Sequence, residues 1–292
     1  MESVKKDGSM VRNINPEFRK DREIMSHACK NNPYYLLYDE TNLKSDRAYI
    51  LSVVEKSPLV MQYASKELTS DREFILEAVK INGVALSHVD DKWKKDREIV
   101  LEAVKKNGLA IPEEFKNDTE IVMIAIKQNG DAIALVDKSF LKDRSVALEA
   151  VKQNGAALVH LPIEFKKDRE IVIEAVKQNV QALQHAYIDL TSDIELMKEL
   201  ARKHETAIAY MPYTLQHDRS FILEAVTHQG LALLQADYIF RKDKEIVLAA
   251  IKQNPKAIEY VASYELKNDP DVQALIKNAP QPSTSSVPQM DQ

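Results

Sequence analysis

An aspartate recurs about every 25 residues along almost the whole chain. Its members are Asp21, Asp46, Asp71, Asp96, Asp118, Asp143, Asp168, Asp193, Asp218, Asp243 and Asp269, with one shorter step of 22 residues after Asp96. A fixed period between about 20 and 50 residues is typical of stacked repeats in which each unit contacts only its neighbours. The period therefore constrains the architecture strongly, but by itself it indicates no activity.

Apolar residues stand at fixed distances from each aspartate. With the Asp as position 0, positions +3, +4, +5, +7 and +8 are apolar, as in Phe74, Ile75, Ala78 and Val79. These positions cover a wide arc of a helix, about 200°, so we expect a helix from about +1 to +11 that packs against neighbours on both flanks. The Asp should cap this helix, because its carboxylate accepts free N–H groups and favours the positive end of the helix dipole.

A second, shorter helix is predicted to begin at the Asn-Gly pair that follows, for example Asn82-Gly83. Glycine after a helix usually has positive φ. The equivalent position in other repeats, which together with this one forms a column of the repeat, also holds Pro33, Pro58 and Pro255, whose φ is locked near −65°. We therefore expect negative φ in this column, with Asn as the cap of the second helix.

The prediction is an all-α fold, an α-solenoid of about ten two-helix repeats with a 25-residue period, over residues 14–278. Residues 1–13 and 279–292 are predicted to be disordered, since the second of these segments is rich in Pro, Ser and Gln.

Composition narrows the partners and the compartment. The net charge of −5 makes nucleic acid an unfavourable partner. No apolar run approaches the about 20 residues needed to span a bilayer, so we expect no membrane insertion. The single cysteine, Cys29, excludes an intrachain disulfide and lies where other repeats place Val or Ile, which predicts a buried thiol. We expect a monomeric, cytoplasmic protein.

The segment Asp96–Lys105 (DREIVLEAVK), repeated almost unchanged at Asp168–Lys177, resembles the repeat family known as domain of unknown function 4116. The resemblance extends over about residues 14–278. It implies no catalytic residue. Because such repeats occur in proteins of amoeba-associated intracellular bacteria and of protists, it implies a bacterial effector or a regulator of one. The partner would then be another effector or a host protein, and the protein would be secreted into a host cytosol, with the C-terminal segment as a candidate export signal.

The motifs of common enzymes are missing from the sequence. His204-Glu205 matches only half of the zinc motif His-Glu-x-x-His, since Ile208 stands at the second ligand position. No glycine-rich phosphate loop occurs either. We therefore expect no catalytic residue, no metal, no cofactor and no enzymatic activity.

Two columns are candidates for binding. Position +17 is mostly aromatic or imidazole, and includes His160, His185 and Tyr210. One interpretation is a half-buried ring that seals the contact between repeats. The alternative is an exposed ladder for a peptide or for the stacked bases of single-stranded RNA.

Position +20 is polar in the first half of the chain and apolar in the second, where Ile163, Ile188, Tyr213 and Tyr238 occupy it, with Tyr187 adjacent to Ile188. If the column is exposed, these side chains form an apolar patch of the kind that binds protein partners. If a local twist turns the column inward, they belong to the core. We favour a non-enzymatic protein-binding module that uses the second-helix surface of the C-terminal half.

Overall fold

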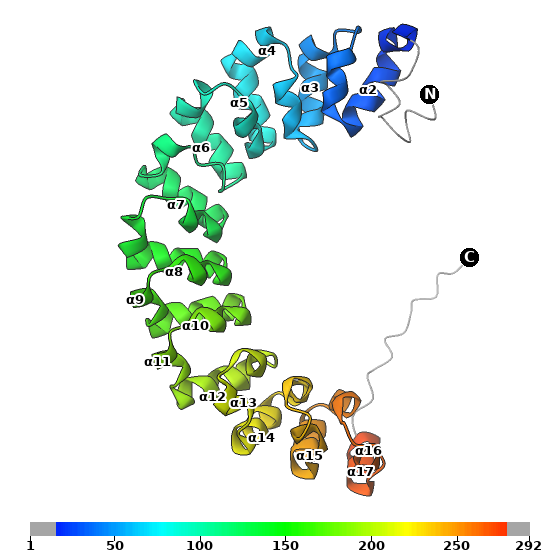
Figure 1. The fold of residues 1–292 in the computed structure, drawn as a ribbon, viewed down its shortest axis with the longest axis vertical. Helices are drawn as coiled ribbons and strands as arrows, with labels where there is room; N and C mark the ends of the chain where they lie inside the picture. Colours follow the sequence, from blue (N-terminus) through cyan, green and yellow to red (C-terminus); the bar gives the residue numbers. More distant parts are fainter. Residues whose placement is uncertain (1–15, 279–292) are drawn as a thin grey trace, which may run out of the picture. The chain divides into compact units, whose positions relative to one another are not determined.

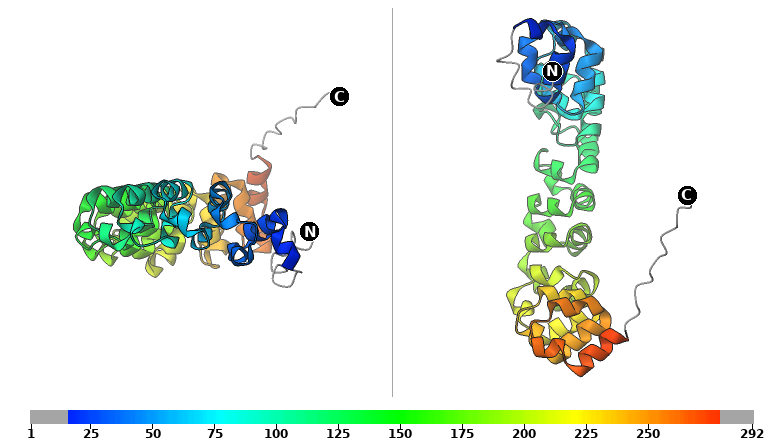
Figure 2. Two further views of the ribbon diagram at one scale, coloured as in Figure 1. Left: turned by 90° about the horizontal axis from the view of Figure 1, so that it is seen from above. Right: turned by 90° about the vertical axis from the view of Figure 1, so that its right-hand side faces the viewer.

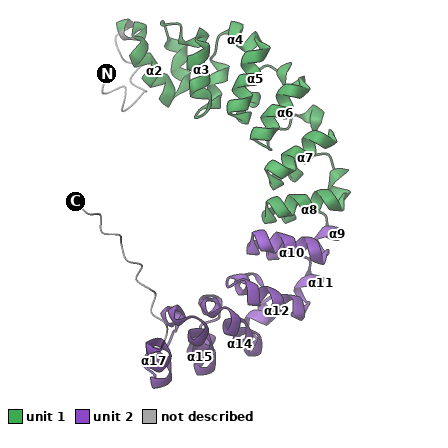
Figure 3. Cartoon of the chain, turned by 180° about the vertical axis from the view of Figure 1, so that it is seen from behind, with its two compact units in different colours: residues 1–162 green, residues 163–292 purple. Residues whose placement is uncertain are grey.

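The computed structural model describes residues 16–278, and every regular element in this range is a helix (Figure 1). This confirms the predicted all-α repeat fold. The predicted disordered segments 1–13 and 279–292 lie outside the described residues. The chain divides into two compact units, residues 1–162 and 163–292 (Figure 3).

Each repeat begins with an α-helix that starts directly after the recurring aspartate. These helices are α2 (Arg22–Asn31), α3 (Arg47–Val54), α5 (Arg72–Ile81), α6 (Arg97–Lys106), α7 (Thr119–Gln128), α8 (Arg144–Gln153), α10 (Arg169–Gln178), α12 (Ile194–Lys203), α14 (Arg219–His228), α15 (Lys244–Gln253) and α17 (Pro270–Lys277). The predicted cap is confirmed. The Asp96 carboxylate, for example, accepts the backbone N–H groups of Glu98 and Ile99 at 3.1 and 3.3 Å.

The second helix of most repeats is a 3-10 helix. These segments are η3 (Pro33–Tyr38), η5 (Pro58–Gln62), η6 (Gly83–His88), η9 (Gly130–Ala134), η11 (Gly155–His160), η12 (Val180–His185), η13 (Ala207–Tyr210), η14 (Gly230–Gln235) and η16 (Pro255–Tyr260). Their four to six residues suit 3-10 geometry, which is used mainly in short runs. The repeat 96–117 is three residues shorter than the 25-residue repeats and forms no 3-10 helix at this place.

A third short helix, which the sequence pattern does not separate from the second, precedes the next aspartate. These segments are η4 (Leu43–Ser45), α4 (Lys66–Ser70), η7 (Trp93–Lys95), η8 (Glu113–Phe115), η10 (Phe140–Lys142), α9 (Ile163–Lys166), α11 (Ile188–Thr191), α13 (Tyr213–Gln216), η15 (Phe240–Lys242) and α16 (Tyr264–Lys267). One further 3-10 helix, η2 (Pro16–Lys20), precedes α2.

Within each unit the long helices form one layer and the 3-10 helices form a second layer against it (Figures 1 and 2). The core lies between consecutive repeats. In α5 it takes Phe74, Ile75, Ala78 and Val79, all fully buried, which are the predicted positions +3, +4, +7 and +8. The apolar residues at +5 are only half-buried, so the buried stripe is narrower than the sequence pattern suggests.

The glycine column has negative φ, as predicted from its prolines. No glycine among residues 16–278 has positive φ, and the Asn82 side chain accepts the N–H of Val84 at the start of η6. Glycine is required for another reason, because the backbone of the following repeat approaches this position closely. A Cβ atom on Gly83 would lie 2.2 Å from the Ala103 carbonyl oxygen of the following repeat.

The recurring aspartate has a second role that was not predicted. In several repeats the arginine that follows it pairs with the aspartate of the next repeat, so these carboxylates link repeats as well as capping helices. Arg72 donates to Asp96 at 2.7 Å and to Glu98 at 2.6 Å, and Arg219 repeats the arrangement with Asp243 and Glu245. These pairs are largely exposed, so each is a small contribution to stability.

Candidate functional site

The four apolar side chains at position +20 are exposed. Their exposed fractions are 56% for Ile163, 68% for Ile188, 73% for Tyr213 and 53% for Tyr238. The alternative in which this column turns inward is therefore wrong. All four belong to the unit 163–292.

The placement of these residues on the second helix is also wrong. Ile163, Ile188 and Tyr213 are the first residues of the third segments α9, α11 and α13. The cause is local. The residue at +18 is extended, with ψ 148° at Ala186 and 163° at Met211, and this ends the 3-10 helix before position +20 is reached.

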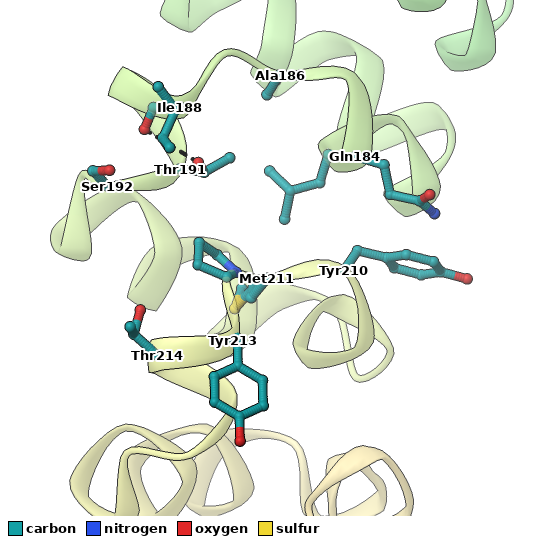
Figure 4. Close-up of a pocket in the computed structure, with 11 residues that line it drawn as sticks. Gln184, Ala186, Ile188, Thr191, Ser192, Tyr210, Met211, Tyr213 and Thr214 are labelled. Carbon is teal, nitrogen blue, oxygen red and sulfur yellow. Dashed lines mark hydrogen bonds between the residues drawn. The ribbon is translucent and has the colours of Figure 1, made fainter.

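Ile188 and Tyr213 contribute to one groove between two consecutive repeats of the unit 163–292. Its volume is about 510 Å³, and it is open to solvent. The lining residues are Leu183, Gln184, Ala186, Ile188, Thr191, Ser192, Tyr210, Met211, Pro212, Tyr213 and Thr214. Figure 4 shows Ile188, Thr191 and Ser192 on one side of this groove, which we call the 188–213 groove, with Met211 and Tyr213 across from them.

The ring of Tyr213 points away from Ile188 (Figure 4). It stacks on the His217 ring, with ring centroids 3.8 Å apart. His217 is held from two sides, because its Nδ1 lies 2.9 Å from the Tyr213 carbonyl oxygen and its Nε2 lies 3.1 Å from Asp237. The Tyr213 side chain is thus exposed but fixed, so a partner that contacts it meets a rigid ring.

The position +17 residues behave mainly as half-buried rings. Tyr210 ends η13, lines the 188–213 groove and accepts a hydrogen bond on its hydroxyl from Gln181 Nε2 at 3.0 Å. His185 ends η12 and is half-buried. His160 is exposed and ends η11, which belongs to the other unit, so the structure does not bring it together with the remaining site residues.

Lysines cover two of the remaining tyrosines. The half-buried Tyr187 caps α11, and Lys167 Nζ lies 4.0 Å from its ring centroid. Lys242 Nζ lies 4.2 Å from the centroid of Tyr238. Cations over aromatic faces at partly exposed sites are worth about 0.5–1 kcal/mol. Neither tyrosine lines the 188–213 groove.

Most residues of the groove, including Leu183, Met211 and Pro212, were not predicted from the sequence. They stand at positions +15, +18 and +19. The first two are apolar in most repeats, as is typical of the core, and the third is mixed, so none of them marks a groove. The sequence does contain one signal for this groove, which is the absence of charged residues from its lining positions. The comparable groove in the unit 1–162 is lined by Glu113, Glu114, Lys116, Asp137 and Lys138 among others, whereas the 188–213 groove has no charged lining residue.

We next consider reactive and metal-binding side chains outside this groove. Burial raises the pKa of the Cys29 thiol to about 12, so this fully buried side chain is no nucleophile at neutral pH. Among residues 16–278 no cluster of three or more His, Cys, Asp or Glu side chains is arranged to hold a metal ion. Within the same range, no helix is both long and apolar enough to cross a membrane.

Comparison with protein families matches the chain to the family described as Domain of unknown function (DUF4116), over residues 1–38, 46–91, 71–112, 96–141, 143–191, 193–241 and 243–272. The chain is a member of the DUF4116 family. Most matched segments begin at a recurring aspartate and extend over nearly two structural repeats, so the family motif corresponds to about two of the repeats seen in the structure. No curated protein and no solved structure matches this DUF4116 chain.

Proposed function

We propose that this DUF4116 protein is a non-enzymatic module that binds a protein partner through the apolar surface of the unit 163–292. The surface is centred on the 188–213 groove and extends to Tyr238. The observation that carries the proposal is the exposure of Ile188, Tyr213 and Tyr238, one in each of three consecutive repeats. Exposed apolar side chains that recur together mark interaction sites, and Tyr is a favoured anchor in them.

The charge of the surface favours protein over nucleic acid. Interface cores in protein complexes are depleted in charged residues and enriched in Tyr and Met, as is the lining of the 188–213 groove. Binding of single-stranded nucleic acid requires Lys and Arg along the phosphate path. The groove supplies neither residue. Lys105 and Lys177 on the long helices pair with Glu102 and Glu174 at 2.7 and 2.5 Å.

The biological setting of the proposal rests on the family resemblance alone. In this setting the protein is a bacterial effector, or a regulator of another effector, and acts in the cytosol of the bacterium or of its host. The partner is then a second effector or a host protein.

The test compares capture by the wild-type chain and by a variant with Ile188→Asp, Tyr213→Asp and Tyr238→Asp. Each immobilised protein is exposed to lysates of the source organism and of its host, and bound proteins are identified by mass spectrometry. We expect specific partners to be lost from the triple variant while its helicity and thermal midpoint stay unchanged, because the three side chains are more than half exposed.

A matched control is Ile194→Asp, which places the same charge on another exposed isoleucine of the unit, 53% exposed, at the first residue of α12. Capture should survive this change. If the triple variant retains every partner that the wild type captures, the proposed surface is wrong.

A further inference from the structure

An equivalent backbone hydrogen bond joins consecutive repeats at several places along the chain. The N–H at position +19 donates to the carbonyl at position −2, two residues before the aspartate that begins the same repeat. That carbonyl lies in the third segment of the preceding repeat or directly after it. In the unit 163–292, Tyr187 donates to the Lys166 carbonyl at 3.0 Å, and Ala262 donates to the Arg241 carbonyl at 2.9 Å. In the unit 1–162, Asp137 donates in the same way to Lys116 at 2.9 Å.

At the 188–213 groove this hydrogen bond cannot form. Position +19 is Pro212, which has no N–H, and the carbonyl that would accept belongs to Thr191. The Thr191 carbonyl receives no hydrogen bond from any residue within 16–278. Pro212 and Thr191 both line the groove, so the residue whose carbonyl lacks this donor belongs to the groove wall.

The groove walls are held in place independently of this missing bond. Gln216 Nε2 donates to the Met211 carbonyl at 3.0 Å and to the Ala209 carbonyl at 3.4 Å, which fixes the backbone on one side. On the other side, the Thr191 hydroxyl donates to the Ile188 carbonyl at 3.2 Å (Figure 4). The site is therefore preformed, which lowers the ordering cost of binding.

The lining combines apolar contact with uncharged hydrogen-bonding groups. Leu183, Ala186 and Met211 supply the apolar part, and the side chains of Gln184 and Ser192 form no hydrogen bond within residues 16–278. A charged group placed here would lose water without gaining an ion-pair partner, which is unfavourable. An α-helix would bring no free N–H to the Thr191 carbonyl except at its first turn, whereas an extended chain offers one at alternate residues.

We propose that the 188–213 groove binds an uncharged, extended peptide segment of a protein partner, whose backbone N–H donates to the Thr191 carbonyl in place of the N–H that Pro212 lacks. A large apolar side chain of the segment fills the space between Ile188 and Met211. This inference rests on the proposed function and specifies the chemistry of the partner.

The test begins with a library of random 12-residue peptides displayed on phage and selected on the immobilised full chain. We expect enriched peptides that carry a large apolar residue flanked by uncharged residues. Two enriched sequences are then synthesised with a fluorescein label, and their affinities are measured by fluorescence anisotropy. Replacing one backbone N–H at a time by N-methyl should weaken binding at a single position next to the apolar anchor.

The decisive variant is Pro212→Ala, which restores an N–H that can compete with the peptide for the Thr191 carbonyl. Affinity for the selected peptides should fall about two- to tenfold, the effect of one net hydrogen bond. Ile188→Asp should abolish binding. The matched control is Pro162→Ala, which makes the same change at position +19 in the unit 1–162 and should leave the affinity unchanged.

Three outcomes overturn the inference: no enrichment of peptides, enrichment of peptides charged at the anchor, or unchanged affinity in Pro212→Ala. The proposed function fails separately, when protein capture from lysate is insensitive to the triple variant. Capture that depends on Ile188 together with a failed peptide selection would mean that the partner is a folded surface, and the extended-segment inference would fall alone.

Discussion

Replacing Gly83 by alanine tests why glycine occupies the column after the long helix. Gly83 has negative φ and lies at the start of η6, where alanine is conformationally acceptable. A prediction from the backbone alone is therefore stabilisation, since alanine reduces the entropy of the unfolded chain by about 0.4–1 kcal/mol. The tertiary contact predicts the opposite sign.

The magnitude follows from the contact. The added Cβ would lie 2.2 Å from the Ala103 carbonyl oxygen and 3.0 Å from the Asn107 Cβ. The first atom belongs to the backbone of α6, so relief requires the next repeat to shift. Overpacking of this kind costs about 1–3 kcal/mol. Set against the entropic gain, the net loss of stability is about 0.5–2 kcal/mol.

The assay is thermal and urea unfolding of the full chain, followed by far-UV circular dichroism. The thermal midpoint of Gly83→Ala should fall by about 1–4 °C. The control is Ser87→Ala on the same 3-10 helix, an exposed position that should change stability by less than about 0.5 kcal/mol. A midpoint for Gly83→Ala equal to or above the wild type would refute the close-approach explanation.

Two further predictions concern titratable groups. Hydrogen bonds from Arg72, Arg97 and Arg219 lower the pKa of Asp96, Asp118 and Asp243 below the usual value of about 3.9. A lowered folded-state pKa contributes stability that is present above about pH 4 and lost as the pH falls through the folded-state value. Asp96→Asn should therefore destabilise the protein at pH 7 and converge on the wild type near pH 2, as measured by urea unfolding at each pH; an equal difference at both pH values would contradict this. Cys29 should react with a thiol reagent such as Ellman's reagent only after denaturation, since its side chain is fully buried and its pKa is raised to about 12; rapid labelling of the native protein would show that it is accessible.

The regular part of the fold could be predicted because each residue in it acts on its own chain neighbours. Asp96 caps α6 through N–H groups two and three residues away, and Asn82 caps η6 in the same way. The prolines at positions equivalent to Gly83 exclude positive φ in that column by themselves, because their ring fixes φ whatever the surroundings.

The third segment of each repeat was missed because its signal is weak in sequence. It has three to five residues, and it is separated from the 3-10 helix by only two to five residues, such as the extended Ala186 and Tyr187. An apolar run does not distinguish one helix from two short ones, since both give similar periodicity. For this reason Ile188 and Tyr213 were assigned to the wrong segment, whereas their exposure agrees with the favoured of the two alternatives that the sequence left open.

The contacts between repeats were harder to predict because they join residues about one period apart. Arg72 and Asp96 were each visible as columns, yet their pairing depends on the offset between stacked repeats, which no local rule supplies. The role of Pro212 is of the same kind. Its missing N–H becomes significant only because the equivalent N–H in other repeats bonds to the carbonyl that corresponds to Thr191.

The sequence by itself determined the repeat, its helix starts and the column that turns apolar in the C-terminal half, because capping and periodicity act within a few residues of the chain. Only the tertiary structure decided which of those residues share a groove. Ile188 and Tyr213 line one groove and Tyr187 and Tyr238 do not, since a groove depends on how one repeat is offset from the next. That offset is set by close backbone contacts and inter-repeat hydrogen bonds, such as those at Gly83 and Tyr187.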